Sequence, residues 1–188
     1  MSRPARPKRI KPGSFLQICL APSYYTYARQ LEGGMTSVAF YDVLVREPFP
    51  DLSHLVQELV ILKTSVLDDR PWLVVGHRPL ETTWPTSWYS WAFDPVSVQS
   101  SGNGWDSDMQ TWLANPSTRY LLVETKRDPI TAAIDSIETP ANLPDLQGLP
   151  RRTIYWPNQI EDKLRLHFGV SQEGEAIAPL PLKQQPFW

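Results

Sequence analysis

Along most of this chain, apolar and β-branched residues fall in short runs that turn residues divide. The first three runs span residues 15–20, 24–31 and 36–41. The turn residues between and before them are Pro12-Gly13, Pro22-Ser23 and Glu32-Gly33-Gly34. Strands of this length joined by short turns predict an antiparallel meander. A meander must bury one face and protect its edges, so we expect it to close into a barrel or pack against helices.

Further runs predict more strands, at residues 60–66, 72–76, 119–124, 134–139 and 151–156. Trp72 to Gly76 is apolar throughout, which is typical of a strand that is buried on both faces. Thr139-Pro140-Ala141-Asn142 predicts the start of a short turn of helix, with proline at its first position.

Two segments have the periodicity of helices. Residues 51–59 place Leu52, Leu55, Val56 and Leu59 on one face. The second and stronger helix begins at Asn158 as N-cap, has Glu161 in the position of a capping box, and ends at Gly169. Its apolar face holds Ile160, Leu164, His167 and Phe168.

These elements predict one α+β domain over residues 12–170. We expect mainly antiparallel strands in a bent, barrel-like sheet, with the C-terminal helix packed on that sheet. Residues 1–11 form a basic tail that we expect to be mobile, and residues 171–188 form a C-terminal extension without a visible motif.

Composition limits the class of protein. The 188 residues include 41% hydrophobic and 20% charged residues, which is typical of a globular domain, and 19 prolines favour short elements. The chain contains no apolar run near the ~20 residues of a membrane span and no signal-peptide pattern at its start. A single cysteine excludes an internal disulfide, so we expect a cytoplasmic protein without a membrane partner.

Charge is unevenly distributed. The formal net charge is −2, but residues 1–11 carry five bases and no acid, which leaves 13 bases against 20 acids in the rest. This acidic body suits a basic partner. Its bases are scattered, which argues against a groove that follows a nucleic-acid backbone.

Few residues suggest catalysis. His54, His77 and His167 have no zinc-ligand spacing. We expect His167 to be a packed boundary residue, His77 to make a hydrogen bond at a strand end, and Cys19 to be a buried, unreactive thiol. The sequence has neither a nucleophile elbow nor a phosphate loop, and the acids Asp68-Asp69 and Asp106-Ser107-Asp108 are typical of solvated loops. We therefore expect no enzyme activity, no metal and no cofactor.

The segment 82–113 contains five tryptophans, broken by proline, serine and glycine. One interpretation is that they fill a core interrupted by loops. The other is that some form a partner-binding surface, because Trp and Tyr are favoured anchors of interfaces. With nearby aromatic and acidic residues, the candidate partner-binding set is Tyr25, Trp84, Trp88, Tyr89, Trp105, Asp106 and Asp108.

Five segments resemble the Imm26 family of bacterial polymorphic-toxin immunity proteins. They are Lys11-Pro12-Gly13, Tyr25 to Leu31, Val38 to Asp42, Trp72 to Leu80, and Tyr155 to Phe168. Two positions depart from the family pattern, since Ser14 stands where Asp is usual and Ala28 where Gly is usual. The segment 82–113 has the weakest resemblance.

The resemblance implies an immunity protein that binds and neutralises a cognate toxin encoded nearby, without chemistry of its own. We expect it to act as a monomer or weak dimer. Two alternatives stay open at this point: an aromatic-lined binding module for a small molecule, glycan or peptide, and a hydrolase that uses the loop acids with His77.

Overall fold

The computed structural model describes residues 10–31, 37–67, 71–80, 87–100, 113–127 and 134–185. It divides into two compact units. The first contains residues up to 84 together with 153–182, and the second contains residues 85–152 and the last six residues. The single domain that the sequence predicts over 12–170 stays a prediction.

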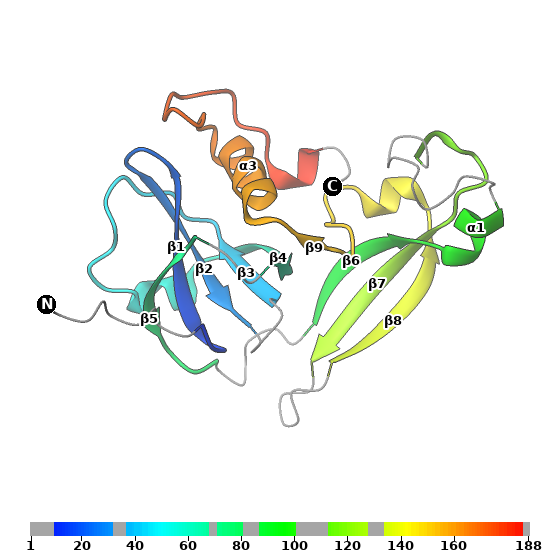
Figure 1. Cartoon of the computed structure of the whole chain (residues 1–188), viewed down its shortest axis with the longest axis horizontal. Coiled ribbons are helices and arrows are strands. Elements are labelled where there is room, and N and C mark those ends of the chain that lie inside the picture. The colour runs from blue at the N-terminus through cyan, green and yellow to red at the C-terminus, as the bar shows by residue number, and fades with distance from the viewer. Residues whose placement is uncertain are drawn as a thin grey trace, which may run out of the picture. The chain divides into compact units, whose positions relative to one another are not determined.

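The first unit is built on a six-stranded sheet in the order β5-β1-β2-β3-β4-β9 (Figure 1). Its strands are β1 (Ser14–Ala21), β2 (Tyr24–Gln30), β3 (Ser37–Tyr41), β4 (Val60–Val66), β5 (Leu73–His77) and β9 (Ile154–Tyr155). All neighbours pair antiparallel except β4 and β9, which are parallel. The predicted meander of the first three strands is confirmed.

Alternation along β1 explains which face meets the helix α3 (Pro157–Phe168). Leu16, Ile18 and Leu20 are buried, whereas Gln17 is half-buried and Cys19 is exposed. Side chains two apart in a strand share a face, so the three aliphatic residues form one side. The helix lies against β1 (Figure 1). It buries Ile160 and Leu164, as the sequence predicts.

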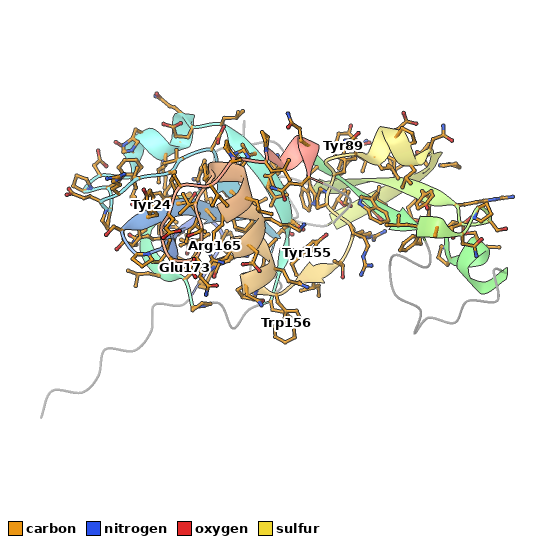
Figure 2. The ribbon with its side chains drawn as sticks, turned by 90° about the horizontal axis from the view of Figure 1, so that it is seen from above. Tyr24, Tyr89, Tyr155, Trp156, Arg165 and Glu173 are labelled. Carbon is orange, nitrogen blue, oxygen red and sulfur yellow. The ribbon has the colours of Figure 1, made fainter. Side chains whose placement is uncertain are left out.

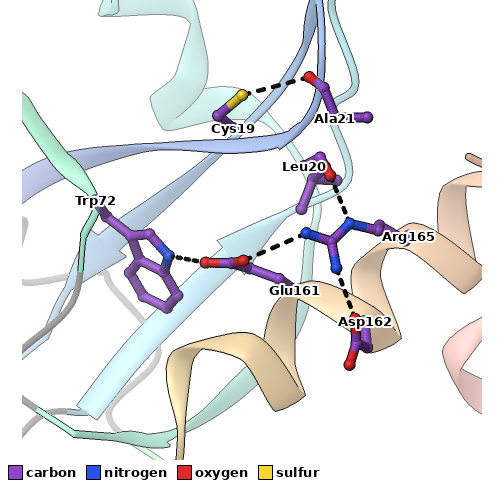
Figure 3. Close-up of polar contacts among 7 residues, drawn as sticks. All are labelled: Cys19, Leu20, Ala21, Trp72, Glu161, Asp162 and Arg165. Carbon is purple, nitrogen blue, oxygen red and sulfur yellow. Dashed lines mark hydrogen bonds and ion pairs between the residues drawn. The ribbon is translucent and has the colours of Figure 1, made fainter. Parts of the chain in front are cut away.

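A polar network also holds α3 to the sheet (Figure 3). Glu161 accepts a hydrogen bond of 2.8 Å from the indole Nε1 of Trp72, and its other oxygen lies 3.4 Å from Arg165. Arg165 also donates to the Leu20 carbonyl and pairs with Asp162 at 2.6 Å. Glu161 therefore joins the helix to the sheet and does not cap it.

The start of α3 differs from the prediction by two residues. The N-cap is Trp156, whose backbone N–H donates to the Gln159 side chain at 3.0 Å, and Pro157 is the first helical residue. Proline suits this position because its missing N–H would be unpaired there. Asn158 consequently lies inside the helix. The predicted end is confirmed, with Gly169 in the left-handed conformation at φ 69°.

Residues 42–59 cover the opposite face of the first sheet. Phe49, Leu52 and Val56 pack against a cluster of buried residues formed by Phe15, Tyr27, Tyr41 and Leu55. The predicted helix over 51–59 is a short 3₁₀ turn, η1 (Ser53–Gln57). Asp51 accepts hydrogen bonds from the backbone N–H and the hydroxyl of Ser53, which favours a tight turn over an α-helix. Leu59, placed on the apolar face, is 67% exposed.

The sheet is not closed into a barrel, which corrects the barrel-like prediction. Its outer strands, β5 and β9, each pair on one side only within the part of the chain described. Both faces of the meander are buried without closure, because α3 covers one face and residues 42–59 cover the other. Since β5 is an edge strand, Leu73 is 62% exposed, and the expectation of burial on both faces is wrong.

The second unit contains a three-stranded antiparallel sheet in the order β6-β7-β8. Its strands are β6 (Ser87–Phe93), β7 (Tyr120–Arg127) and β8 (Ile134–Ala141), with a short helix α1 (Pro95–Ser100) after β6. Trp91, Tyr120 and Leu146 form its core, with Phe93 and Leu122 packed around them. The predicted strands 119–124 and 134–139 are confirmed and are longer than expected.

Two predicted elements around this unit are displaced. The helical turn expected from Thr139 begins at Leu143, as the 3₁₀ helix η2 (Leu143–Leu146), and Pro140 lies in β8. Proline is tolerated because β8 is an edge of the sheet. Of the strand predicted at 151–156, only Ile154–Tyr155 pairs as a strand. A last 3₁₀ turn, η3, spans Leu182–Gln184.

Candidate partner-binding surface

The structure describes three of the seven predicted partner-binding residues. Tyr25 lies in the first unit, and Trp88 and Tyr89 lie in the second. Trp84, Trp105, Asp106 and Asp108 lie outside the described residues, as do the loop acids Asp68 and Asp69. The described members of the predicted set therefore lie in two different units.

Tyr25 uses its backbone to hold a loop. It exchanges hydrogen bonds with Val45, 2.8 Å from its own N–H and 2.9 Å to its carbonyl, and its side chain is half-buried. Its neighbour Tyr24, which sequence reasoning did not select, stacks under Arg46 at 5.4 Å and accepts a hydrogen bond from it at 3.2 Å. Through these contacts, both tyrosines hold the segment around Val45 and Arg46 against this end of the sheet.

Trp88 and Tyr89 are adjacent on β6 and therefore point to opposite faces of the three-stranded sheet. Trp88 is half-buried, whereas Tyr89 is 48% exposed (Figure 2). The fully buried tryptophan of this strand is Trp91, which supports the core interpretation for that residue. Of the described predicted residues, Tyr89 is the most accessible to a partner.

Tyr89 belongs to a row of three directly paired residues across the sheet. It lies opposite Glu124 on β7, and Glu124 lies opposite Ile137 on β8. Ile137 is 48% exposed, and Glu124 pairs with Lys126 at 3.2 Å. We call Tyr89, Glu124 and Ile137 the open row. Adjacent cross-strand residues stand about 5 Å apart, so the open row presents two apolar groups on either side of a carboxylate.

The open row lies on the same face of the sheet as the core of this unit, and the core begins two residues further along each strand. The next row on that face is Trp91, Leu122 and Thr139, followed by Phe93, Tyr120 and Ala141. Leu143, Leu146 and Leu149 pack over this part. They cover only one end of the sheet, so the same face is core at one end and accessible at the other. Sequence reasoning missed Glu124 and Ile137 because only the register places them beside Tyr89.

A second accessible aromatic residue lies at the N-cap of α3. Trp156 is 56% exposed and projects away from the helix (Figure 2), and Ile154 is 39% exposed on the preceding strand. Tyr155 between them is buried, as strand alternation requires. The sequence predicts Trp156 as the last residue of a strand and does not single it out as an exposed aromatic residue. Its position before Pro157 was the available signal that it lies outside the helix.

The histidines lie in separate structural settings. His77 Nε2 lies 2.9 Å from the Pro12 carbonyl, which confirms the expected strand-end bond. His167 is a boundary residue as predicted, between Asp42 Oδ1 at 3.0 Å and the backbone N–H of Leu182 at 3.3 Å. The ring of His54 packs edge-on against Phe49. Among the residues that the structure describes, no group of His, Cys, Asp and Glu could hold a metal ion.

Cys19 corrects a prediction. It is exposed, and its thiol lies 3.3 Å from the Ala21 carbonyl. The apolar run 15–20 wrongly predicted burial of Cys19, because α3 covers only one face of β1. Ile18 and Leu20 occupy that face. Cys19 takes the alternate face near a register shift in the pairing with β2, beyond the cover that residues 42–59 give to Phe15.

Comparison of the chain with models of known families, with curated proteins and with solved structures finds no match. In the described ranges, none of the helices has the length and apolar character needed to cross a membrane.

Proposed function

We propose that this protein binds and neutralises a cognate bacterial toxin domain encoded nearby, acting in the cytoplasm as a stoichiometric inhibitor and as a monomer or weak dimer. The toxin part of this proposal comes from the resemblance of five segments to the Imm26 family. The observation that carries the binding part is the open row, where Tyr89 and Ile137 are each 48% exposed on a sheet face whose other end is covered by Leu143, Leu146 and Leu149.

The open row has the composition of an interface centre. Tyrosine is enriched at such positions because it supplies a large contact area with few rotatable bonds, and a strand holds it in a fixed place. Glu124 adds a carboxylate between the two apolar groups, and Asp135 lies next to Lys126 in the adjoining row. This local charge, and the excess of acids in the body of the chain, favours a basic partner surface.

The test is protection of cells that express the neighbouring toxin. Tyr89→Ala and Ile137→Ala should each weaken the complex by about 2 kcal/mol, or roughly thirtyfold in affinity, and should reduce protection. The matched control is Val96→Ala, an exposed apolar residue in the same unit that lies on α1. Association should also slow as salt rises, because the attraction between an acidic and a basic protein is screened.

Two outcomes would contradict different parts of the proposal. If Tyr89→Ala and Ile137→Ala fold, protect and bind as wild type does, the open row is the wrong surface. Trp88→Ala and Trp105→Ala then test two of the remaining aromatic candidates. If the wild-type protein gives neither protection nor a complex with the toxin, the immunity function itself is wrong.

A further inference from the structure

The second unit contains a pocket that neither the resemblance nor the open row accounts for. Its volume is about 370 Å³, and it lies where β7 begins and β8 ends. The lining residues are Thr118, Arg119, Tyr120, Pro140, Ala141, Asn142 and Leu143. Tyr120 and Ala141 are directly paired across the two strands, so the sheet itself fixes the two sides of the pocket. This volume is at the small end of the range for ligand sites.

Four of the lining residues offer polar side chains. Within the described part of the chain, the side chains of Thr118, Arg119, Tyr120 and Asn142 form no hydrogen bond or ion pair. Asn142 is the N-cap of η2, yet its amide does not cap that turn. A side chain at an N-cap normally bonds to the backbone ahead of it, so this amide stays available. Partial burial raises the pKa of Tyr120, which keeps its hydroxyl protonated as a neutral donor.

The pocket lining carries a positive charge. Arg119 is the charged lining residue, and it is exposed, while its backbone is held by the Ser97 hydroxyl and the Asp94 N–H. Asp94 itself uses its carboxylate to accept the backbone N–H of Val96 at 2.9 Å. A guanidinium presents two parallel N–H donors that match a carboxylate. Pro140, Ala141 and Leu143 supply an apolar wall beside it.

From this combination we infer that the pocket binds a small organic acid, with its carboxylate on Arg119 and its apolar part against Pro140 and Leu143. Thr118 and Asn142 lie within the same lining and offer donors to the second carboxylate oxygen. The site is separate from the open row, which lies further along β7 at Glu124. It therefore represents a second binding property of this unit, independent of the toxin.

The experiment is a titration of the full-length ¹⁵N-labelled chain with benzoate, followed by ¹H–¹⁵N spectra. Saturable shifts should concentrate at the backbone amides of residues 118–120 and 141–143. Arg119→Gln should lower the affinity for benzoate by about tenfold or more, because a hydrogen bond to a charged group is lost. Arg46→Gln, an exposed arginine of the other unit, should leave it unchanged.

Two further probes separate charge from apolar contact. Benzamide has the ring of benzoate without its charge, and inorganic phosphate has a charge without a ring, so both should bind more weakly. Equal binding of benzamide would overturn the role of Arg119, and equal binding of phosphate would overturn the assignment to an organic acid. Shifts that do not saturate, or that persist unchanged in Arg119→Gln, would refute the site.

Discussion

The two sheets of this protein differ in how completely their faces are covered. In the first unit, α3 packs on one face and residues 42–59 on the other, and even Arg29 is fully buried. Its guanidinium lies over the Phe15 ring and donates to the carbonyls of Arg78 and Pro79 at 3.1 and 2.9 Å. In the second unit, the leucines after β8 cover one end of a face and leave the open row accessible.

This difference indicates that the first unit contributes mainly stability and that the second offers a surface to a partner. A buried polar group must find partners inside the fold, and the first unit supplies backbone carbonyls even to an arginine. An exposed tyrosine and isoleucine on a rigid strand contribute little to stability and remain available to a partner. Four predictions test this comparison, from the largest expected effect to the smallest.

The largest effect is expected in the covered sheet, from Leu164→Asp. Leu164 is fully buried on α3, so the variant places an unpaired charge in the core and should lose at least about 4 kcal/mol of stability. Thermal melting followed by circular dichroism measures this loss. The control is Leu166→Asp on the same helix, where the leucine is 40% exposed and the loss should be small. Native melting of Leu164→Asp would remove the assignment of α3 to the core.

Gly13→Ala should produce the next largest effect. Gly13 has φ 85°, and a Cβ there would overlap the carbonyl oxygen of Arg78. Its N–H also donates to the Gln30 carbonyl at 2.8 Å, so the backbone has little room to move. We expect a loss of about 3 kcal/mol in denaturant unfolding. Gly174→Ala, at φ 89° without such an overlap, should cost only about 1 kcal/mol. Equal losses would mean that the overlap is relieved.

A smaller, pH-dependent effect is expected from Lys163 on α3. Burial lowers its pKa to about 8 from the ordinary 10.5, although the Asp162 carboxylate acts in the opposite direction. The unfolded chain therefore binds more protons between these two values, and stability should rise as pH increases from about 8 to 10.5. In Lys163→Met this rise should be smaller than in wild type, measured by urea unfolding at several pH values.

Burial also lowers the pKa of Lys63 on β4, so wild type and Lys163→Met share that contribution. The difference between the two proteins therefore isolates Lys163. An identical pH dependence in both would mean that the Lys163 ammonium is not desolvated by the sheet.

The smallest effect on stability is expected at the open row. Tyr89→Ala should change the free energy of unfolding by no more than about 0.5 kcal/mol, because the side chain is half exposed. Leu146→Ala, at a fully buried residue over the other end of the same sheet, should cost about 2–5 kcal/mol. A large loss in Tyr89→Ala would show that the open row belongs to the core.

Short runs of apolar and β-branched residues, divided by turn residues, predicted most of the strands. In some of these strands the buried face repeats every second residue. Leu16, Ile18 and Leu20 have this pattern, and so does the strand 60–66, in which Leu62, Thr64 and Val66 are buried. The same pattern did not reveal edges. Leu73 and Cys19 are apolar residues that the described elements leave exposed, and coverage depends on tertiary packing.

The candidate surface was predicted only in part for a related reason. Tyr89 was selected by its residue type, but Glu124 and Ile137 join it through strand register, which links residues far apart in sequence. The cap of α3 was misplaced because Asn158 and Glu161 fit a capping box, while Trp156 and Gln159 form the contact. Pro157 at the first helical position favours the earlier cap, because its missing N–H would be unpaired there.

The division of the chain has a consequence for synthesis on the ribosome. The first unit is interrupted, since residues 85–152 separate β5 from β9 and α3. Between the emergence of β4 and the emergence of α3 from the exit tunnel, roughly 100 residues are translated, which takes on the order of 5–20 s. During that interval the aliphatic face of Leu16, Ile18 and Leu20 has no helix to cover it. The nascent chain should therefore be most dependent on chaperones while the second unit is being made.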